Sequence, residues 1–280
     1  MGMKKGICKL CLLEKDLCLS HYMPRATYKY NRASGLKTPH PVMLTGGKPK
    51  QGTAQVKDYV LCQACENRFR VNGETWVLAN IPHDYGNRFP LHEAVKAARP
   101  AIEEPGRALI AGKTTKGFDT DKLIYFGASI FWRGAAHRWP PIDGHEIEVL
   151  HLGEYQEQFR LFLLGRLSFP SDVSLTVMLW PFEKVAVAAS LPRRSPWDKW
   201  ERYWFYLNGL GFVVDIGRTV PEVFRVRSTS NSPEQFITID NQFGNMVWKV
   251  MKQDLGDDFS ELASMIKEIE AVRSKTRRDK

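Results

Sequence analysis

The sequence of 280 residues predicts an α+β protein, in which a small cysteine-bearing N-terminal module precedes a larger mixed α/β domain. All five cysteines fall within the first 65 residues, as two C-x-x-C pairs with one cysteine between them. Later segments with helical spacing of apolar residues are interspersed with segments rich in aromatic and β-branched residues. We therefore expect the module to cover residues 1–82 and the second domain residues 91–280, with a loop rich in Pro, His and Asn between them.

Two strands and a helix are expected in the module. The segment LSHYMPR (19–25) is predicted to be a strand that enters a turn at Pro24. The segment DYVLC (58–62) is predicted to be a second strand, after which the second C-x-x-C pair begins a helix that runs toward Gly73 and can resume just beyond it. Residues 31–56 are rich in Gly, Pro, Thr and Lys and lack apolar periodicity, which predicts a long loop.

The helices and strands of the second domain are expected where the spacing of apolar residues changes. Three segments show helical spacing, the first of them behind an Asp119/Thr120 cap: 119–138, 153–166 and 258–273. Four segments with clustered aromatic and β-branched residues are expected to be strands: 174–180, 203–207, 211–216 and 234–239. The Asn208–Gly209 pair between two of them predicts a hairpin turn. No motif in this domain indicates a ligand, so a role in selecting substrate, protein partner or homo-oligomer is left open.

Nearly all of the excess positive charge belongs to the module. The chain carries 40 Lys+Arg and 31 Asp+Glu, a net charge of +9; residues 1–82 hold 13 basic and 5 acidic residues, whereas residues 83–280 hold 27 and 26. No acid occurs between Asp16 and Asp58, and residues 26–57 are named the basic loop. The cations of this acid-free stretch are Arg25, Lys29, Arg32, Lys37, Lys48, Lys50 and Lys57. Such a pattern is typical of proteins that bind the phosphate backbone of nucleic acids, although a solvated loop shows it too.

Four of the five cysteines are predicted to bind one structural zinc ion. A C-x-x-C turn places two thiolates on one side of an ion, and two such turns supply the four tetrahedral ligands that zinc prefers. The predicted ligands are Cys8, Cys11, Cys62 and Cys65. A second ligand set would use Cys18 and His21 with the first pair and would leave the second pair unused.

The N-terminus does not have the pattern of a secretory signal peptide. Glu14 and Asp16 interrupt any apolar segment there, and no run in the chain approaches the ~18 to 20 apolar residues that span a bilayer. We therefore expect a cytoplasmic protein, in which the cysteines stay reduced and a disulfide framework is excluded.

The order of these motifs resembles a known nuclease family. A C-x-x-C pair, Ser-His before a Pro turn, a long insertion and Leu-Cys-x-x-Cys-Glu at a helix start are similar to the zinc-stapled branch of the HNH (ββα-metal) endonucleases. The resemblance covers residues 7 to about 80. In that family a histidine at the end of the first strand is the general base, and one divalent metal ion is held between that strand and the following helix. The resemblance therefore implies a ββα-metal-like fold for the module.

The resemblance also assigns roles to individual residues. His21 corresponds to the general base, Glu66 to the metal ligand on the helix with Asn67 next to it, and Glu74 to a glutamate further downstream. Ser20 stands where many members carry Asp or His, and Glu66 replaces the usual histidine. Because carboxylates suit Mg²⁺ and Mn²⁺, the resemblance implies a catalytic Mg or Mn ion in addition to the structural zinc.

The sequence therefore predicts a metal-dependent HNH-like endonuclease that hydrolyses phosphodiester bonds, in DNA rather than RNA. Arg25, Arg68 and Arg70 lie close in sequence to the expected site and, with the cations of the basic loop, are expected to hold the nucleic acid. The resemblance suggests a role in bacterial defence. The alternative is a zinc-stabilised nucleic-acid-binding or scaffold protein without catalytic activity. The other six histidines have no partner spacing and are expected to be ordinary surface or core residues.

Overall fold

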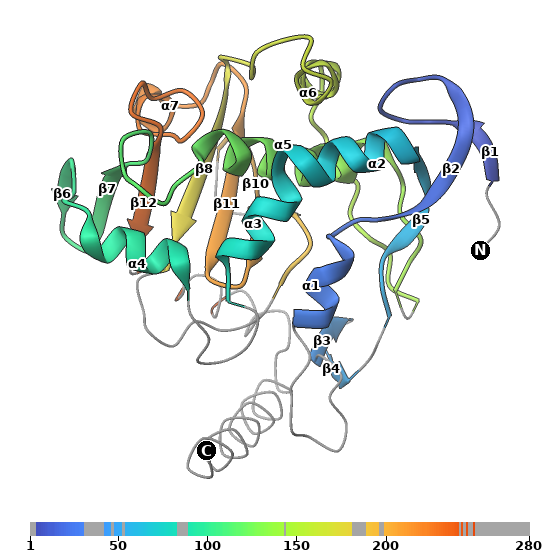
Figure 1. The fold of residues 1–280 in the computed structure, drawn as a ribbon, viewed down its shortest axis with the longest axis horizontal. Coiled ribbons are helices and arrows are strands. Elements are labelled where there is room, and N and C mark those ends of the chain that lie inside the picture. The colour runs from blue at the N-terminus through green and yellow to red at the C-terminus, as the bar shows by residue number, and fades with distance from the viewer. Residues whose placement is uncertain are drawn as a thin grey trace.

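The computed structural model describes residues 4–30, 42–45, 48–51, 54–82, 89–142, 144–180, 189–195 and 199–240, together with residues 242, 245 and 249. The helix predicted at 258–273 lies outside the described residues. Helices are present together with a small three-stranded sheet and a larger mixed sheet, which confirms the predicted α+β class. Figure 1 shows the two sheets on opposite sides of a group of helices.

The three-stranded sheet lies near the start of the chain and is antiparallel throughout. Its strands follow the order β1-β2-β5, with bounds β1 (Lys4–Ile7), β2 (Glu14–His21) and β5 (Lys57–Cys62). The strand β2 ends at His21, and α1 (Arg25–Tyr30) begins directly after Pro24. Both strands predicted in the module are therefore present, and the turn at the proline is confirmed.

The basic loop contains a small sheet that the sequence reasoning missed. The strand β3 (Val42–Thr45) pairs antiparallel with β4 (Lys48–Gln51), so the prediction of an irregular loop over 31–56 is wrong for these residues. The sequence places two glycines between the strands, which is a hairpin signal. The lack of apolar alternation in the flanking residues concealed it.

A continuous helical run follows the small sheet. It consists of α2 (Gln63–Phe69), a π-helical turn η1 (Arg70–Glu74) and α3 (Thr75–Asn80). Gly73 lies against the next long helix so closely that a Cβ there would come within 3.0 Å of the Phe126 backbone nitrogen. The helix therefore continues through Gly73, because glycine permits this close contact.

The larger sheet has seven strands in the order β6-β7-β12-β8-β11-β10-β9. Neighbouring strands are antiparallel except for β12 and β8, which are parallel. The bounds are β6 (Ile102–Glu104), β7 (Arg107–Ala111), β8 (Val173–Leu179), β9 (Arg193–Arg194), β10 (Glu201–Leu207), β11 (Leu210–Ile216) and β12 (Phe236–Asp240). The predicted hairpin is confirmed: Asn208 and Gly209 connect β10 to β11 with φ values of 42° and 92°.

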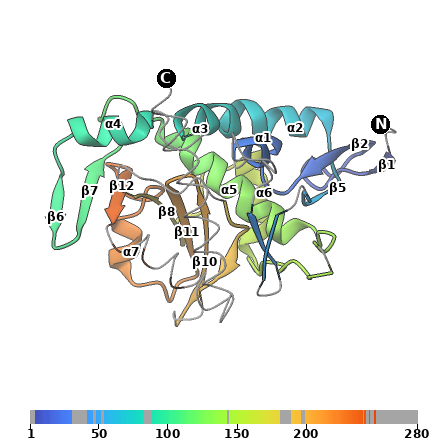
Figure 2. The same cartoon turned by 90° about the horizontal axis from the view of Figure 1, so that it is seen from below.

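The long helix α5 (Thr120–Ala136) joins the two sheets into one core. Its Asp119 cap accepts a hydrogen bond from the Lys122 backbone N–H at 3.1 Å, as predicted. Figure 2 shows α5 between the larger sheet and the helices α2 and α3. On the sheet side, Phe126 packs on Phe205 and Phe212, whereas Gly73 approaches it from the other side. One cluster of buried hydrophobic residues contains members from both parts of the chain. The division into two domains, residues 1–82 and 91–280, stays a prediction.

The remaining helices lie around this core. They are α4 (Pro90–Ala97), α6 (Tyr155–Leu163) and α7 (Glu222–Val226). The helix α6 confirms the helix predicted at 153–166.

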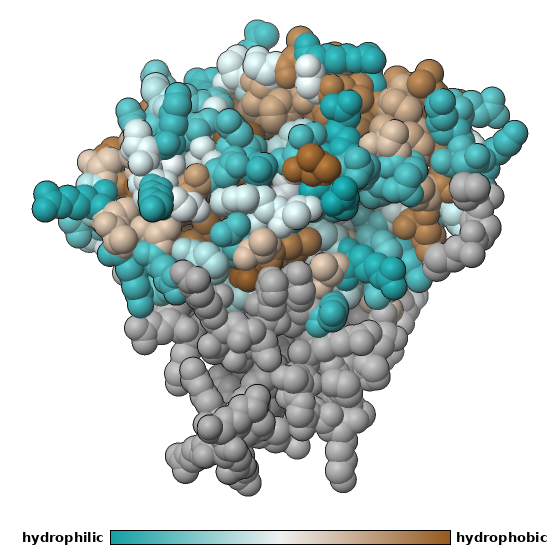
Figure 3. Space-filling view, in the orientation of Figure 1, coloured by the Kyte–Doolittle hydropathy of each residue, from teal (hydrophilic) through white to brown (hydrophobic). Residues whose placement is uncertain are grey.

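Figure 3 shows a surface on which polar residues predominate and hydrophobic residues form separate areas. Among the described residues, Ile7, Leu12 and Leu13 are exposed large hydrophobic residues that flank the first C-x-x-C pair.

Candidate metal centre and adjoining carboxylate cluster

Four cysteines from three places in the chain converge at one end of the small sheet. They are Cys8 and Cys11 in the turn between β1 and β2, Cys62 at the end of β5 and Cys65 in the first turn of α2. Their four Sγ atoms all lie within 4.8 Å of one another, and we name them the cysteine tetrad. The strand β5 ends where α2 begins, and this junction brings the second pair to the first.

The donor set of the tetrad fits a tetrahedral metal ion such as zinc. A zinc ion bound at ~2.3 Å to each thiolate requires sulfur atoms separated by about 3.8 Å. The Sγ atoms of Cys11 and Cys62 are 4.0 Å apart, whereas a disulfide would require about 2.05 Å. All five cysteines are free thiols. The tetrad can therefore hold one metal ion such as zinc.

The environment of Cys8 favours its thiolate form. The thiol of Cys65 and the backbone N–H groups around Cys8, including that of Cys62 at 3.4 Å, lower the pKa of Cys8 to about 4. A thiolate is the form of cysteine that ligates metal ions. The Cys65 thiol and the local backbone together therefore favour the form of this sulfur that binds a metal ion.

The second ligand set, with Cys18 and His21, is not brought together. The Cys18 thiol donates a hydrogen bond to the Gln63 side-chain oxygen at 3.4 Å, and its sulfur is not among the converging ligand atoms. His21 instead contacts Gln55 and Tyr28. Of the two arrangements that the sequence left open, the structure has the geometry of the first.

His21, the predicted general base, is the last residue of β2 and is partly buried. A ring nitrogen lies 2.9 Å from the side-chain oxygen of Gln55. Burial lowers the pKa of His21 below its ordinary value, and the positive charges of Lys57, Arg25 and Arg133 lower it further, against the opposing effect of Gln55. The imidazole is therefore neutral near pH 7 and able to accept a proton.

Three charged side chains, one buried and two partly buried, form a cluster beside the tetrad. We name Glu66, Glu74 and Arg133 the carboxylate cluster. Arg133 comes from α5 and is only 2% exposed. Its guanidinium donates to Glu74 at 2.7 Å, lies 4.0 Å from Glu66 and donates to the backbone carbonyl of Tyr22 at 3.4 Å. The same group lies 4.7 Å from the centre of the Phe69 ring. One cation from the second part of the chain thus lies beside two carboxylates of the module.

Glu66 remains the least satisfied member of this cluster. Burial raises its pKa above the usual range, although Arg133 and the Ser20 hydroxyl act in the opposite direction. Its Oε1 atom is buried and has no hydrogen-bond partner among the described residues, and the same holds for Arg133 Nε and the Tyr22 hydroxyl. Buried polar atoms without partners are uncommon, and each indicates a place where water or an ion can bind.

Of the three predicted ligands of a catalytic divalent ion, Glu66 and Glu74 lie beside Arg133, whereas Asn67 is engaged elsewhere. Glu74 is committed to Arg133, and Asn67 is exposed and accepts hydrogen bonds from Arg70 at 2.7 and 3.2 Å. Within the described part of the chain, no hydrogen bond or ion pair joins His21 to Glu66, and no metal-binding group of three or more residues besides the tetrad is found. The Ser20 hydroxyl of β2 acts on the Glu66 carboxyl group and lowers its pKa. The assignment of Glu66, Asn67 and Glu74 to a metal ion stays a prediction.

The sequence reasoning missed Arg133, although one signal could have indicated it. Arg133 is a single charge within the apolar segment SIFWRGA of α5. A lone arginine on an apolar helix predicts a buried ion pair, since an unpaired buried charge is very costly. Its two partners lie 59 and 67 positions away, so the sequence could not name them.

The structure describes the side chains of only some of the residues predicted to bind nucleic acid. Arg25, Lys29 and Lys57 are exposed around the end of β2. Arg68 donates to the Leu164 carbonyl at 3.3 Å, and Arg70 is held by Asn67. Arg32 and Lys37 lie outside the described residues, and Lys48 and Lys50 are described only as part of the β4 backbone.

Comparison with known proteins supplies no identification. No family model, no curated protein and no solved structure matches the chain. The described residues contain no helix of the length and apolarity needed to cross a membrane.

Proposed function

We propose that this protein is a divalent-metal-dependent, HNH-like nuclease that hydrolyses phosphodiester bonds with His21 as the general base. The observation that carries the proposal is the environment of His21, which ends β2 and is flanked by Arg25 and Lys57. Burial and these cations keep the imidazole neutral, as a general base requires, and the same cations can hold phosphate oxygens. The succession β2–β5–α2, closed by the cysteine tetrad, supports the proposed relation to ββα-metal nucleases.

In the proposed step, a ring nitrogen of His21 takes a proton from a water molecule while the water oxygen bonds to phosphorus. The bond between phosphorus and the leaving sugar oxygen breaks, and the leaving oxygen takes a proton from solvent. A Mg²⁺ or Mn²⁺ ion beside Glu66 would supply positive charge that stabilises the phosphate in this reaction. The unpartnered Oε1 of Glu66 supports this location for the ion.

A second candidate function is nucleic-acid binding without cleavage, and the position of Arg133 favours it. Arg133 already provides the positive charge next to Glu74 and Glu66 that a divalent ion would otherwise provide. On this alternative the tetrad stabilises a basic module that contacts the phosphate backbone of DNA. A role in bacterial defence would be compatible with either function.

A cleavage assay distinguishes the two functions. Supercoiled plasmid is incubated with the purified protein and Mg²⁺ or Mn²⁺, and wild type is compared with His21→Ala. If His21 is the general base, the variant cleaves at least about 10² times more slowly, because general-base catalysis contributes 10² to 10⁴. His151→Ala is the matched control, since His151 is exposed and lies outside the module. Zinc content and thermal stability are measured on all three proteins.

The absence of cleavage would contradict the first function and leave the second. If wild type cleaves neither plasmid nor single-stranded DNA with any divalent ion, the nuclease proposal is wrong. The binding alternative then predicts affinity for DNA that falls steeply with salt. Neutralising three lysines should reduce the slope of log K against log salt by up to about 2.7, because each phosphate contact contributes about 0.9. These lysines are Lys48, Lys50 and Lys57.

A further inference from the structure

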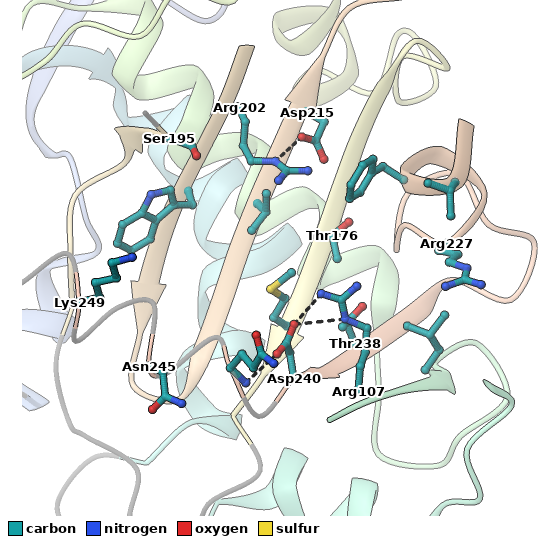
Figure 4. Close-up of a pocket in the computed structure, with 17 residues that line it drawn as sticks. Arg107, Thr176, Ser195, Arg202, Asp215, Arg227, Thr238, Asp240, Asn245 and Lys249 are labelled. Carbon is teal, nitrogen blue, oxygen red and sulfur yellow. Dashed lines mark hydrogen bonds and ion pairs between the residues drawn. The ribbon is translucent and has the colours of Figure 1, made fainter. Parts of the chain in front are cut away.

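The larger sheet carries a cavity on the face that α5 does not cover. Side chains alternate along its central strands: Leu175, Phe205 and Phe212 belong to the core on the α5 side, whereas their neighbours Thr176, Trp204 and Val213 line the cavity. The volume of the cavity is about 780 Å³. Figure 4 shows the lining side chains projecting from several strands, with helices behind the sheet. This volume lies within the ~300 to 1,000 Å³ range of small-molecule sites.

Two arginines of the cavity are held in fixed positions by buried or nearly buried carboxylates. Arg202 Nε lies 2.5 Å from Asp215 Oδ1, and the exposed fraction of Asp215 is 1%. Arg107 pairs with Asp240 at 2.8 Å, and Figure 4 shows both pairs on the cavity side of the sheet. Because their carboxylate partners orient them, these guanidinium groups lose little freedom when they bind an anion.

Aromatic rings add a second constraint on Arg202. Its guanidinium carbon lies 5.1 Å from the centre of the Trp200 ring and 4.8 Å from that of Phe224. The Trp200 indole N–H donates to the same Asp215 oxygen at 2.6 Å. This part of the cavity therefore combines an ordered guanidinium, a group that binds phosphate through its N–H donors, with the ring of Phe224.

The remaining lining groups favour an anionic ligand that also contains a planar ring. Four cationic and two carboxylate side chains line the cavity, and Arg227 also pairs with Glu104 at 2.6 Å; the cations are Arg107, Arg202, Arg227 and Lys249. Apolar surface is supplied by residues such as Met178 and Val213. The indole N–H of Trp204, a residue that is 3% exposed, is buried and has no hydrogen-bond partner among the described residues. A buried donor without a partner is costly, so a ligand acceptor at this position would be favourable.

We propose that this cavity binds a nucleoside phosphate. The phosphate groups contact the arginines, and the base lies over the apolar part of the cavity, where the Trp204 N–H donates to a ring or carbonyl acceptor. Inorganic phosphate would satisfy only the charge, and a nucleoside would satisfy only the apolar surface and the indole donor. The site is independent of His21 and the cysteine tetrad, which belong to the other part of the chain.

Isothermal titration calorimetry of the full chain tests this proposal. ATP, GTP, CTP and UTP are titrated separately, with inorganic triphosphate and adenosine as partial probes. At least one nucleotide is expected to bind at micromolar concentration and at least tenfold more tightly than either partial probe. Binding of inorganic triphosphate as tightly as the best nucleotide would overturn the assignment of a base. Absence of binding by all four nucleotides at millimolar concentration would overturn the site.

Two variants locate the binding. Arg227→Ala removes a cation whose partner Glu104 is 38% exposed, so the fold should tolerate the change, and about tenfold weaker binding is expected. Trp204→Phe keeps an aromatic ring but removes the N–H donor and should also weaken binding. Arg138→Ala is the control, because Arg138 is 77% exposed and does not line the cavity. Wild-type affinity in both variants would show that the nucleotide binds elsewhere.

Discussion

Replacing Arg133 by methionine tests whether the carboxylate cluster joins the two parts of the chain. Methionine approximates the length and apolar stem of arginine but leaves Glu74, whose side chain is 14% exposed, facing an apolar environment without its partner. Breaking a buried ion pair by removal of one member costs about 3 to 5 kcal/mol. A domain of ordinary stability has about 5 to 15 kcal/mol in total, so the effect should be large. Urea denaturation followed by circular dichroism, at constant zinc concentration, measures it.

The control for this experiment is Arg138→Met, five positions further along the chain. Arg138 pairs with Glu146 at 3.4 Å, and the two side chains are 77% and 66% exposed. Exposed pairs of this kind contribute about 0 to 1 kcal/mol, so this variant should unfold at nearly the wild-type urea concentration. Replacement of arginine by methionine should therefore lower the free energy of unfolding strongly at the buried position 133 and only slightly at the exposed position 138.

A double-mutant cycle that combines Arg133→Met with Glu74→Gln tests whether the loss of stability comes from the ion pair between these two residues. The effects of Arg133→Met and Glu74→Gln should be non-additive by at least about 1 kcal/mol, because Gln removes the charge that Arg133→Met leaves uncompensated. If the two free energies add to within about 0.5 kcal/mol, the ion pair does not stabilise the fold and the argument for the cluster fails. An Arg133→Met protein as stable as wild type would lead to the same conclusion.

The remaining predictions concern the tetrad and the candidate base. Cys62→Ser should reduce bound zinc, measured by elemental analysis at about one ion per chain in wild type, and should destabilise the module, because metal binding is coupled to folding. Cys18→Ser should retain the zinc; loss of zinc in that variant would favour the other ligand set. The folded-state pKa of His21 lies below its unfolded value, so protonation favours the unfolded chain and stability should fall as the pH drops below about 6.5. Lys57→Met removes one of the charges that lower this pKa, so the His21 ring should titrate at higher pH in an NMR titration; an unchanged midpoint would contradict the stated cause.

Local features of the fold were predictable because they depend on neighbouring residues. The Asp119 cap, the Asn208–Gly209 turn and the strand ending before Pro24 each follow from the conformational preferences of one or two residues. The basic loop shows the limit of this reasoning. Its β3–β4 hairpin has no apolar alternation, and periodicity was the signal on which the strand predictions depended.

The candidate site was predictable in part for the same reason. The spacing within each C-x-x-C pair is local, and the chemistry of zinc then requires that two such pairs meet, so the sequence alone predicted the tetrad. The ion pairs of Arg133 could not be predicted, because they depend on the distance between α5 and the helical run after β5. That distance is short because Gly73 and Phe126 are in contact. The spacing of residues in the sequence does not predict such a contact between distant segments.

The sequence by itself therefore determined the fold class, the long helix α5, the central strands of the larger sheet, the concentration of positive charge in the module and the four cysteines that can hold a metal ion. The tertiary structure alone decided that Glu66 and Glu74 face an arginine, and that the Ser20 hydroxyl acts on Glu66. It alone also formed the cavity, since the lining residues come from strands whose order in the sheet differs from their order in the chain. The physical reason is that residue preferences and short spacings act over a few positions, whereas burial and charge pairing depend on which distant segments the folded core brings into contact.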